Sequence, residues 1–302
     1  MKLPDAPPKF YRALAISQVL AVVCWLAALY FQSTGKIAVW YDQQTTFTQL
    51  ASHWRDPYVV PGFINPPWTV LLLLPFGLIP VPLAVLIQQC LYFGLLTAVI
   101  YKFTGGQVIR LGRFRFDRFA IVLIVLTSFF ALDSGIELSL EWIVCIGLLV
   151  PAAYSGPLLL VKPQDALGVV VSYRWRDVLR TGILTLAVVL ASFALWGEWI
   201  TPYLDSLRRA SYYKSYNLAP SAIIGWIPAL AIGLLLMAIA FRRRDPVLCV
   251  LAWQFFVPYS TLYILMLPFA IAATRFPRVA LLISVTMWIL YGRIALLTFL
   301  GS

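Results

Sequence analysis

Apolar runs of about 20 residues recur from end to end of the chain and are separated by short polar connections. A helical run of that length matches the hydrocarbon core of a bilayer, so the pattern predicts an all-α, polytopic membrane protein. We expect about eleven transmembrane or half-membrane helices in a single integral membrane domain, residues 1–302. The first run, Leu14–Phe31, leads into further spans without a small-residue cleavage site, so we interpret it as a retained helix.

Composition agrees with this pattern, and charge orients the chain. Hydrophobic residues make up 62% of the 302 residues and charged residues 12%, which leaves little polar sequence for a soluble domain. The net charge of +11 comes from basic clusters beside the apolar runs, so it indicates orientation rather than nucleic-acid binding. With these clusters in the cytoplasm, we predict a multi-pass plasma-membrane protein. Its N-terminus is then cytoplasmic, and its C-terminus and reactive face lie outside. The clusters are the N-terminus, 102–118, 174–180, 242–244 and 275–278.

The connection after the first run, residues 32–80, has a pattern unlike the rest of the chain. Its apolar side chains recur at helical spacing at Phe47, Leu50, Ala51 and Trp54. This spacing predicts an amphipathic helix over Gln43–Trp54 that lies in the membrane interface. Asp42 then stands at the N-terminal end of that helix, where free backbone amides favour a carboxylate.

The same connection ends in an apolar run that is too short to cross a bilayer. At ~1.5 Å per residue, Pro67–Ile79 reaches about 20 Å, whereas the hydrocarbon core measures ~30 Å. Asn65 supplies a helix cap, and Pro66 follows it as a first-turn proline. The pattern therefore predicts a re-entrant or interfacial helix that belongs to the external connection.

A second interruption divides the apolar sequence between residues 153 and 173 at Lys162-Pro163-Gln164-Asp165. Each arm is short, so we expect two half-length or tilted helices with a polar break deep in the protein. A further external loop is expected at 196–221. Full crossings are predicted at 81–101, 119–132, 138–150, 181–197, 221–241, 246–257 and 259–273, and a last one begins at Val279.

Acidic residues near membrane depth are energetically unfavourable, so those at the expected outer face are candidates for function. Asp133 and Glu137 flank the tight turn expected between two crossings, and Glu141 lies one turn further in. The first two are candidate acceptor or metal contacts, and turn or cap roles explain them equally well. The four cysteines lie in apolar runs without paired spacing and are interpreted as packing residues. No cofactor is expected, and a divalent metal is not indicated.

Seven short motifs follow one another along the chain: Asp42, Asp56–Tyr58, Phe63–Pro67, Leu74–Gly77, Leu160–Gln164, Asn217–Ser221 and Pro258–Tyr263. Their order resembles family 87 of the GT-C glycosyltransferases, polytopic enzymes similar to polyprenyl-phosphate-mannose-dependent mannosyltransferases. The resemblance implies a GT-C-like fold and an inverting transfer of a mannose-like hexose. The donor would be polyprenyl-phosphate-linked, and the acceptor would be a lipid or glycan on the non-cytoplasmic face. Membrane lipids are the remaining expected partners, and no nucleic acid is expected.

By the same resemblance, Asp42 is the catalytic base that takes the proton of an acceptor hydroxyl. Cations suit the departing phosphate, arginine through its bidentate fork and lysine as a compact charge. The candidates for donor-phosphate or substrate binding are Lys162, Gln164, Arg208, Arg209, Lys214 and Asn65. The sequence has no Gly-rich nucleotide loop, Walker element or Asp-x-Asp motif, which argues against a nucleotide-sugar or ATP enzyme.

Other interpretations of these residues stay open. Asp42 could be a helix cap, Lys162 could pair with Asp165 or another acid, and the arginines could be ordinary loop charges. A transporter or lipid-carrier flippase would also use broken helices and buried charge, although the first-half motifs do not recur in the second half. A catalytically silent relative that acts as an assembly partner is the third alternative.

Overall fold

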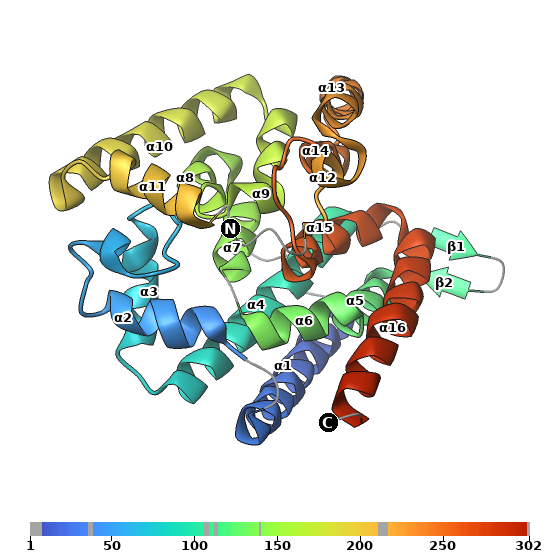
Figure 1. Ribbon diagram of the computed structural model, residues 1–302. Coiled ribbons are helices and arrows are strands. Elements are labelled where there is room, and N and C mark those ends of the chain that lie inside the picture. Colours follow the sequence, from blue (N-terminus) through green and yellow to red (C-terminus); the bar gives the residue numbers. More distant parts are fainter. Residues whose placement is uncertain are drawn as a thin grey trace.

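The computed structural model describes residues 8–35, 39–105, 109–111, 114–138, 140–210 and 217–300. Helices make up most of this part of the chain (Figure 1). The described strands are β1 (Ile109–Leu111) and β2 (Phe114–Phe116), an antiparallel pair in which Ile109 lies opposite Phe116. The predicted helical class is therefore confirmed, with this small strand pair as an addition.

Several described helices are long and apolar enough to cross a membrane. They are α1 (Pro8–Thr34), α4 (Val81–Thr104), α10 (Trp175–Trp196) and α13 (Trp226–Arg243). Helices α5 (Arg118–Leu126) and α6 (Phe129–Glu137) are bent by 57° relative to each other and would add one span as a pair. Length and composition thus indicate a membrane protein, whereas the larger count of about eleven passes stays a prediction.

The chain after Asp117 is more broken than its hydropathy predicts. The crossings predicted at 119–132 and 138–150 are replaced by α5, α6 and α7 (Glu141–Leu149). Ser128 begins α6 because its hydroxyl accepts a hydrogen bond from the amide of Ala131. Leu138, with a φ of 42°, ends the same helix. Serine is a preferred N-cap residue, and a hydropathy pattern does not register that preference.

Helices α1 and α4 run antiparallel in close contact. Buried small residues on α1 let the two backbones approach, and these are Ala13, Ala21 and Ala28. The hydroxyl of Tyr101 donates to the carbonyl of Lys9 over 2.9 Å, so the end of α4 lies beside the start of α1. Arg118 stacks on the ring of Tyr101 with 5.6 Å to its centroid. Basic residues of α1 and of the start of α5 therefore gather at this end of the pair.

The connection from residue 39 to residue 80 packs back onto the protein. Its amphipathic segment forms a π-helical turn, η1 (Gln43–Phe47), followed by α2 (Thr48–Leu50), so the helix predicted to reach Trp54 is shorter than expected. Phe47 and Leu50 are buried, and a side chain at Gly77 would lie 3.0 Å from the Phe47 carbonyl. The apolar stripe of this segment therefore packs against α3 (Thr69–Gly77).

Helix α3 confirms the short helix predicted at Pro67–Ile79, but it starts differently. The predicted Asn65 cap is wrong, because no side chain caps the first turn. The amide of Thr69 bonds the carbonyl of Pro66 at 3.0 Å, so backbone turns around the two prolines begin the helix instead. The carbonyl of Asn65 accepts a hydrogen bond of 3.1 Å from the hydroxyl of Tyr58.

The predicted break between residues 153 and 173 is confirmed, although it divides the chain into four pieces rather than two. These are η3 (Ala152–Tyr154), α8 (Gly156–Leu159), α9 (Pro163–Ala166) and η4 (Leu167–Ser172). Side chains satisfy the freed carbonyls: Trp253 donates to Pro163 over 2.8 Å and Gln254 donates to Gln164 over 3.0 Å. Irregular backbone at membrane depth needs such partners, because hydrocarbon offers none.

The second half of the chain carries the remaining helices. They are α11 (Ile200–Ala210), α12 (Pro220–Ile224), α14 (Pro246–Trp253), α15 (Leu262–Arg275) and α16 (Pro277–Leu300). The crossing predicted at 221–241 is divided at Gly225, whose φ of 84° suits glycine. Helices α10 and α13 lie at the periphery in Figure 1 and expose apolar side chains such as Leu186 and Leu235.

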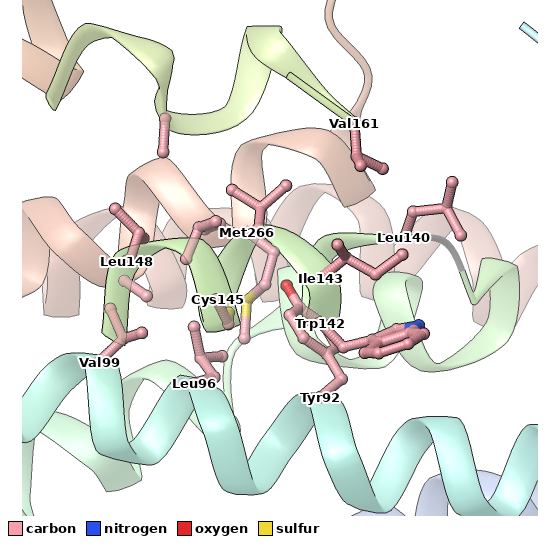
Figure 2. Packing of buried hydrophobic residues seen from close by; sticks show 14 of the residues in the cluster. Tyr92, Leu96, Val99, Leu140, Trp142, Ile143, Cys145, Leu148, Val161 and Met266 are labelled. Carbon is pink, nitrogen blue, oxygen red and sulfur yellow. The ribbon is translucent and has the colours of Figure 1, made fainter. Parts of the chain in front are cut away.

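The four pieces from η3 to η4, residues 152–172, are called the broken segment below. The core forms where α4, α7 and α15 meet this segment (Figure 2). Its buried side chains come from all four elements and include Tyr92, Leu96, Val99, Ile143, Cys145, Leu148, Val161 and Met266. Cys145 and the other cysteines are free, and Cys145 packs among these apolar groups. The interpretation of the cysteines as packing residues is therefore confirmed for Cys145.

Close backbone contact between η4 and α14 makes Gly168 sensitive to substitution. A Cβ atom at Gly168 would clash with the side chain of Trp253 and lie 2.5 Å from the carbonyl oxygen of Cys249. We expect Gly168→Ala to destabilise the fold by about 1–3 kcal/mol, the usual effect of overpacking. Thermal unfolding in detergent measures this, with Gly182→Ala as the control.

Gly182 lies inside α10, and a Cβ there would meet nothing within 4 Å. That substitution should be neutral or stabilising, by up to about 1 kcal/mol, because alanine favours a helix interior. Equal stabilities for the two variants would show that η4 and α14 are not in close contact.

Candidate active site

A strained stretch of backbone holds Asp42 in place. Trp40 has a φ of 54°, is fully buried, and donates its amide to the carbonyl of Ile136 over 2.8 Å. Leu138 has a φ of 42° and packs in the same small cluster. Bulky residues adopt such angles only where the surrounding packing enforces them. This Trp40 cluster, formed by Ala28, Val39, Trp40, Val85 and Leu138, fixes the connection that carries Asp42 against the end of α6.

Asp42 is half-buried at the start of the helical turn that η1 continues. Its side chain makes no capping hydrogen bond, so the interpretation of Asp42 as a helix cap is wrong. Burial raises the pKa of this carboxyl group to about 6, the positive charge of Lys162 limits the rise, and the charge of Glu141 adds to it. The structure thus brings Asp42 within electrostatic range of two residues more than ninety positions away in the sequence.

Lys162 lies just before α9 with only 6% of its side chain exposed. Its ammonium forms an ion pair with Oε1 of Glu141, the first residue of α7, whose side chain is 1% exposed. The ammonium also lies 4.7 Å from the ring centroid of Tyr263, a cation–π distance. Of the acids with which Lys162 could pair, Asp165 or another, the structure identifies Glu141 as the partner in the ion pair.

A third region reaches the same site from the connection before α15. Asn217 holds this connection, because its side chain donates to the carbonyl of Pro258 at 2.8 Å and accepts from the amide of Ser260 at 3.0 Å. Ser221 supports it with a bond of 3.0 Å to the carbonyl of Val257. Tyr259, in this connection, then lies within electrostatic range of Lys162.

Asp133 and Glu137 lie in α6, one turn apart, so the prediction that they flank a tight turn is wrong. The reason is the capping of α6 by Ser128, which moves the break in the chain upstream of both acids. The carboxyl group of Glu137 interacts electrostatically with those of Asp133 and Asp42. Ser134, between the two acids, donates to the carbonyl of Tyr263 over 3.2 Å, which joins α6 to the start of α15.

The other residues predicted to bind the donor phosphate or substrate make contacts apart from the ion pair of Lys162 and Glu141. Gln164 is half-buried, and its carbonyl accepts from Gln254. Arg208 pairs with Asp205 at 3.1 Å, and Arg209 donates to Ser206 at 3.0 Å. These contacts lie within α11, which packs on η2 (Pro57–Val59) through a ring contact between Tyr203 and Tyr58. The role of the two arginines at a donor phosphate stays a prediction, and Lys214 lies outside the described residues.

In the sequence, Glu141 stands out only as an acid near the expected membrane surface, and nothing in the residue spacing predicts that Tyr259 or Tyr263 lies beside Lys162. A signal for the ion pair was present, because an acid and a base each interrupt an apolar run. Charges buried in apolar surroundings are usually paired, so each of the two was a candidate partner for the other. Among the described residues, no group of three or more His, Cys, Asp or Glu is arranged to hold a metal ion.

Comparison of the chain with known protein families, with curated proteins and with solved structures gives no match. The site is therefore defined by its own geometry. A half-buried carboxylate with a raised pKa lies near a buried ammonium that is held by a second carboxylate and an aromatic ring. Such an arrangement can accept a proton at one point and stabilise negative charge close by.

Proposed function

We propose that this protein is an inverting, membrane-embedded glycosyltransferase that moves a mannose-like hexose from a polyprenyl-phosphate donor to an acceptor outside the cytoplasm. One observation carries the proposal. Three regions that the family resemblance marks separately, around Asp42, Lys162 and Tyr263, meet at one site. A base and a cation are the two groups that this reaction needs, one for the acceptor hydroxyl and one for the departing phosphate.

In this mechanism Asp42 accepts the proton of the acceptor hydroxyl while the oxygen attacks the anomeric carbon. The bond from that carbon to the lipid phosphate breaks, and attack from the opposite face inverts the anomeric configuration. Lys162 stabilises the negative charge that grows on the phosphate, and Glu141 and Tyr263 hold the ammonium in position. Half-burial of Asp42 strengthens these electrostatic effects, because they are weakly screened away from water.

An apolar groove beside the broken segment supports a lipid-linked donor. The groove has a volume of about 400 Å³ and lies between the broken segment and α10. Its lining is almost entirely apolar and includes Leu160, Leu167, Val178 and Val189. Leu160 is two residues from Lys162 in the sequence, so the proposal places the hydrocarbon chain of the donor in this groove and its phosphate toward that cation.

The arrangement of charge along α1 supports an outer active site. Lys9 and the neighbouring basic residues gather where α1 begins, and the Trp40 cluster and Asp42 follow where α1 ends. Because basic residues favour the cytoplasmic side, the N-terminus would be cytoplasmic and Asp42 external.

The pH dependence of transfer should report the ionisation of Asp42. A base must be deprotonated to act, and the pKa of this carboxyl group is about 6. We expect kcat/KM to rise about tenfold per pH unit below pH 6 and to level off above it. Initial rates of transfer in proteoliposomes, measured across this range, provide the check. A profile without an inflection near pH 6 would contradict the assignment of Asp42 as the base.

The proposed function is tested by sugar transfer in proteoliposomes. The purified chain is supplied with radiolabelled polyprenyl-phosphate-mannose, and with the glucose counterpart in a parallel sample. Membrane extracts serve as the source of acceptor. We expect labelled product whose anomeric configuration is opposite to that of the donor. Retention of configuration would overturn the inverting mechanism, and absence of transfer from both donors would overturn the proposed activity.

The buried ion pair in a broken segment also favours a second candidate, a lipid-carrier flippase, because such breaks occur at transport sites. A scrambling assay with fluorescent polyprenyl phosphate in the same vesicles distinguishes the two. Lipid movement without sugar transfer would support the flippase, whereas transfer without lipid movement would support the transferase.

A further inference from the structure

Asp165 presents an electrostatic problem that the proposed mechanism leaves unsolved. Its side chain is fully buried in α9, and neither carboxyl oxygen has a hydrogen-bond partner among the described residues. Buried polar groups nearly always have partners, and an ionised carboxylate without one is especially unfavourable in a protein interior. A buried carboxylate at Asp165 would therefore need a hydrogen-bond donor or an unpaired positive charge nearby.

The groups that face Asp165 provide neither a hydrogen bond to its carboxyl oxygens nor a positive charge that is not already paired. Lys162 is close enough for an electrostatic interaction, but its ammonium is already in an ion pair with Glu141. The negative charge of Glu141 acts against a second carboxylate at Asp165, and the other titratable groups that interact electrostatically with Asp165 are Tyr92 on α4 and Cys145 on α7. Both are buried and neither carries a positive charge, so they do not balance a second carboxylate beside the ion pair.

Gln254 on α14 adds a second, independent observation. Its amide nitrogen donates to the carbonyl oxygens of Gln164 and Asp165, at 3.0 and 3.3 Å. Its amide oxygen is buried and has no donor among the described residues. This corner of the core therefore has three buried acceptor oxygens, two on Asp165 and one on Gln254, and all lack a donor. A single proton on the carboxyl group would create a donor and remove a buried negative charge at once.

We propose that Asp165 is a proton-binding site and that it is a neutral carboxylic acid in the folded protein. The ion pair of Lys162 and Glu141 is then balanced, and Asp165 adds no charge to it. One consequence rests on the proposed function: the ammonium of Lys162 is shared with Glu141 and the departing phosphate, not with a second buried carboxylate. The proton site itself follows from burial and missing donors, whatever reaction the protein performs.

Infrared spectroscopy of the purified protein tests the site without any assay of transfer. Protein labelled with ¹³C in the aspartate carboxyl group is measured at about pH 8, where Asp42, with a pKa of about 6, is ionised. We expect a band from a protonated aspartic acid that shifts with the label and on exchange into D₂O. The band should disappear in Asp165→Asn and persist in Asp42→Asn and Asp133→Asn.

The labelled wild-type protein keeps the test decisive if Asp165→Asn fails to fold. Absence of a protonated aspartic-acid band in wild type, or its loss in Asp133→Asn instead, would overturn the proposal. A bound metal cation is the competing explanation, because carboxylate and amide oxygens suit Na⁺ as well. Replacing Na⁺ and K⁺ with choline should leave the melting temperature unchanged. A clear fall on that replacement would assign the site to a metal cation rather than a proton.

Discussion

Asparagine in place of Asp42 is expected to lower sugar transfer about 10²- to 10⁴-fold, the usual contribution of a general base. The substitution keeps the shape of the side chain but removes its ability to accept a proton. Folding should not suffer, because the carboxylate makes no capping bond that asparagine would have to replace. Initial rates of transfer with saturating donor, compared with the melting temperature of each variant, measure the two effects separately.

The sign of the stability effect follows from the raised pKa of Asp42. The pKa of this carboxyl group is about 6 in the folded protein and 3.8 for an unperturbed aspartate, as in the unfolded chain, so the folded state binds the proton more tightly. The contribution of this group to stability therefore falls as the pH rises from about 4 to about 6. Above pH 6, Asp42→Asn should be at least as stable as wild type.

Asp56→Asn is the matched control for that substitution. Asp56 lies in the same connection and is exposed. Its replacement should leave both the rate and the melting temperature close to those of wild type. Equal transfer by wild type and Asp42→Asn would remove Asp42 from the chemistry, and attention would move to Glu137, whose carboxyl group is an electrostatic neighbour.

The second large effect is expected at Glu141. Glu141→Gln leaves the ammonium of Lys162 buried without its charged partner, and breaking a buried pair in this way destabilises proteins by about 3–5 kcal/mol. The melting temperature in detergent should fall markedly, and transfer should fall with it because Lys162 loses its fixed position. Lys9→Ala provides the contrast, since the pair of Lys9 with Asp117 is exposed and such pairs contribute about 0–1 kcal/mol.

A double variant separates stability from activity at this pair. Glu141→Gln combined with Lys162→Met removes the uncompensated charge, so we expect most of the lost stability to return. Transfer should stay low, because no cation then faces the phosphate. Recovery of both properties would show that Lys162 has a structural role only. Failure to recover stability would show that the ion pair is not the main source of the loss.

The short helix α3 and the break before α9 could be predicted because individual proline or charged residues determine where each helix ends. Pro67 and Pro80 limit a short helix, and the polar Lys162–Asp165 sequence breaks an apolar run wherever it lies. The break at Ser128 could not be predicted from hydropathy, because a serine hydroxyl inside a membrane segment can either cap a helix or bond back within one. Only the structure shows that it caps α6.

The sequence predicted which residues belong to the candidate site better than it predicted how they are arranged in space. Asp42 and Lys162 each stand out locally, one at the end of an apolar run and one inside another. Their proximity depends on how α1, α7 and the broken segment pack, and sequence spacing carries no information on that packing. The positive φ of Trp40 is also invisible in the sequence, because tryptophan rarely adopts it and nothing local requires it here.

The Trp40 cluster divides the site into a fixed side and an adjustable side. Moving Asp42 away from α6 would require Trp40 and Leu138 to leave the packing that enforces their backbone angles, so this packing holds the proposed base in position. The opposite side, around Tyr259, is tied down by polar bonds through Asn217 and Ser221, which can exchange for bonds to a ligand. In the proposed transferase reaction, a large lipid-linked substrate would enter by displacement of the Pro258–Thr261 connection, while Asp42 stays in place.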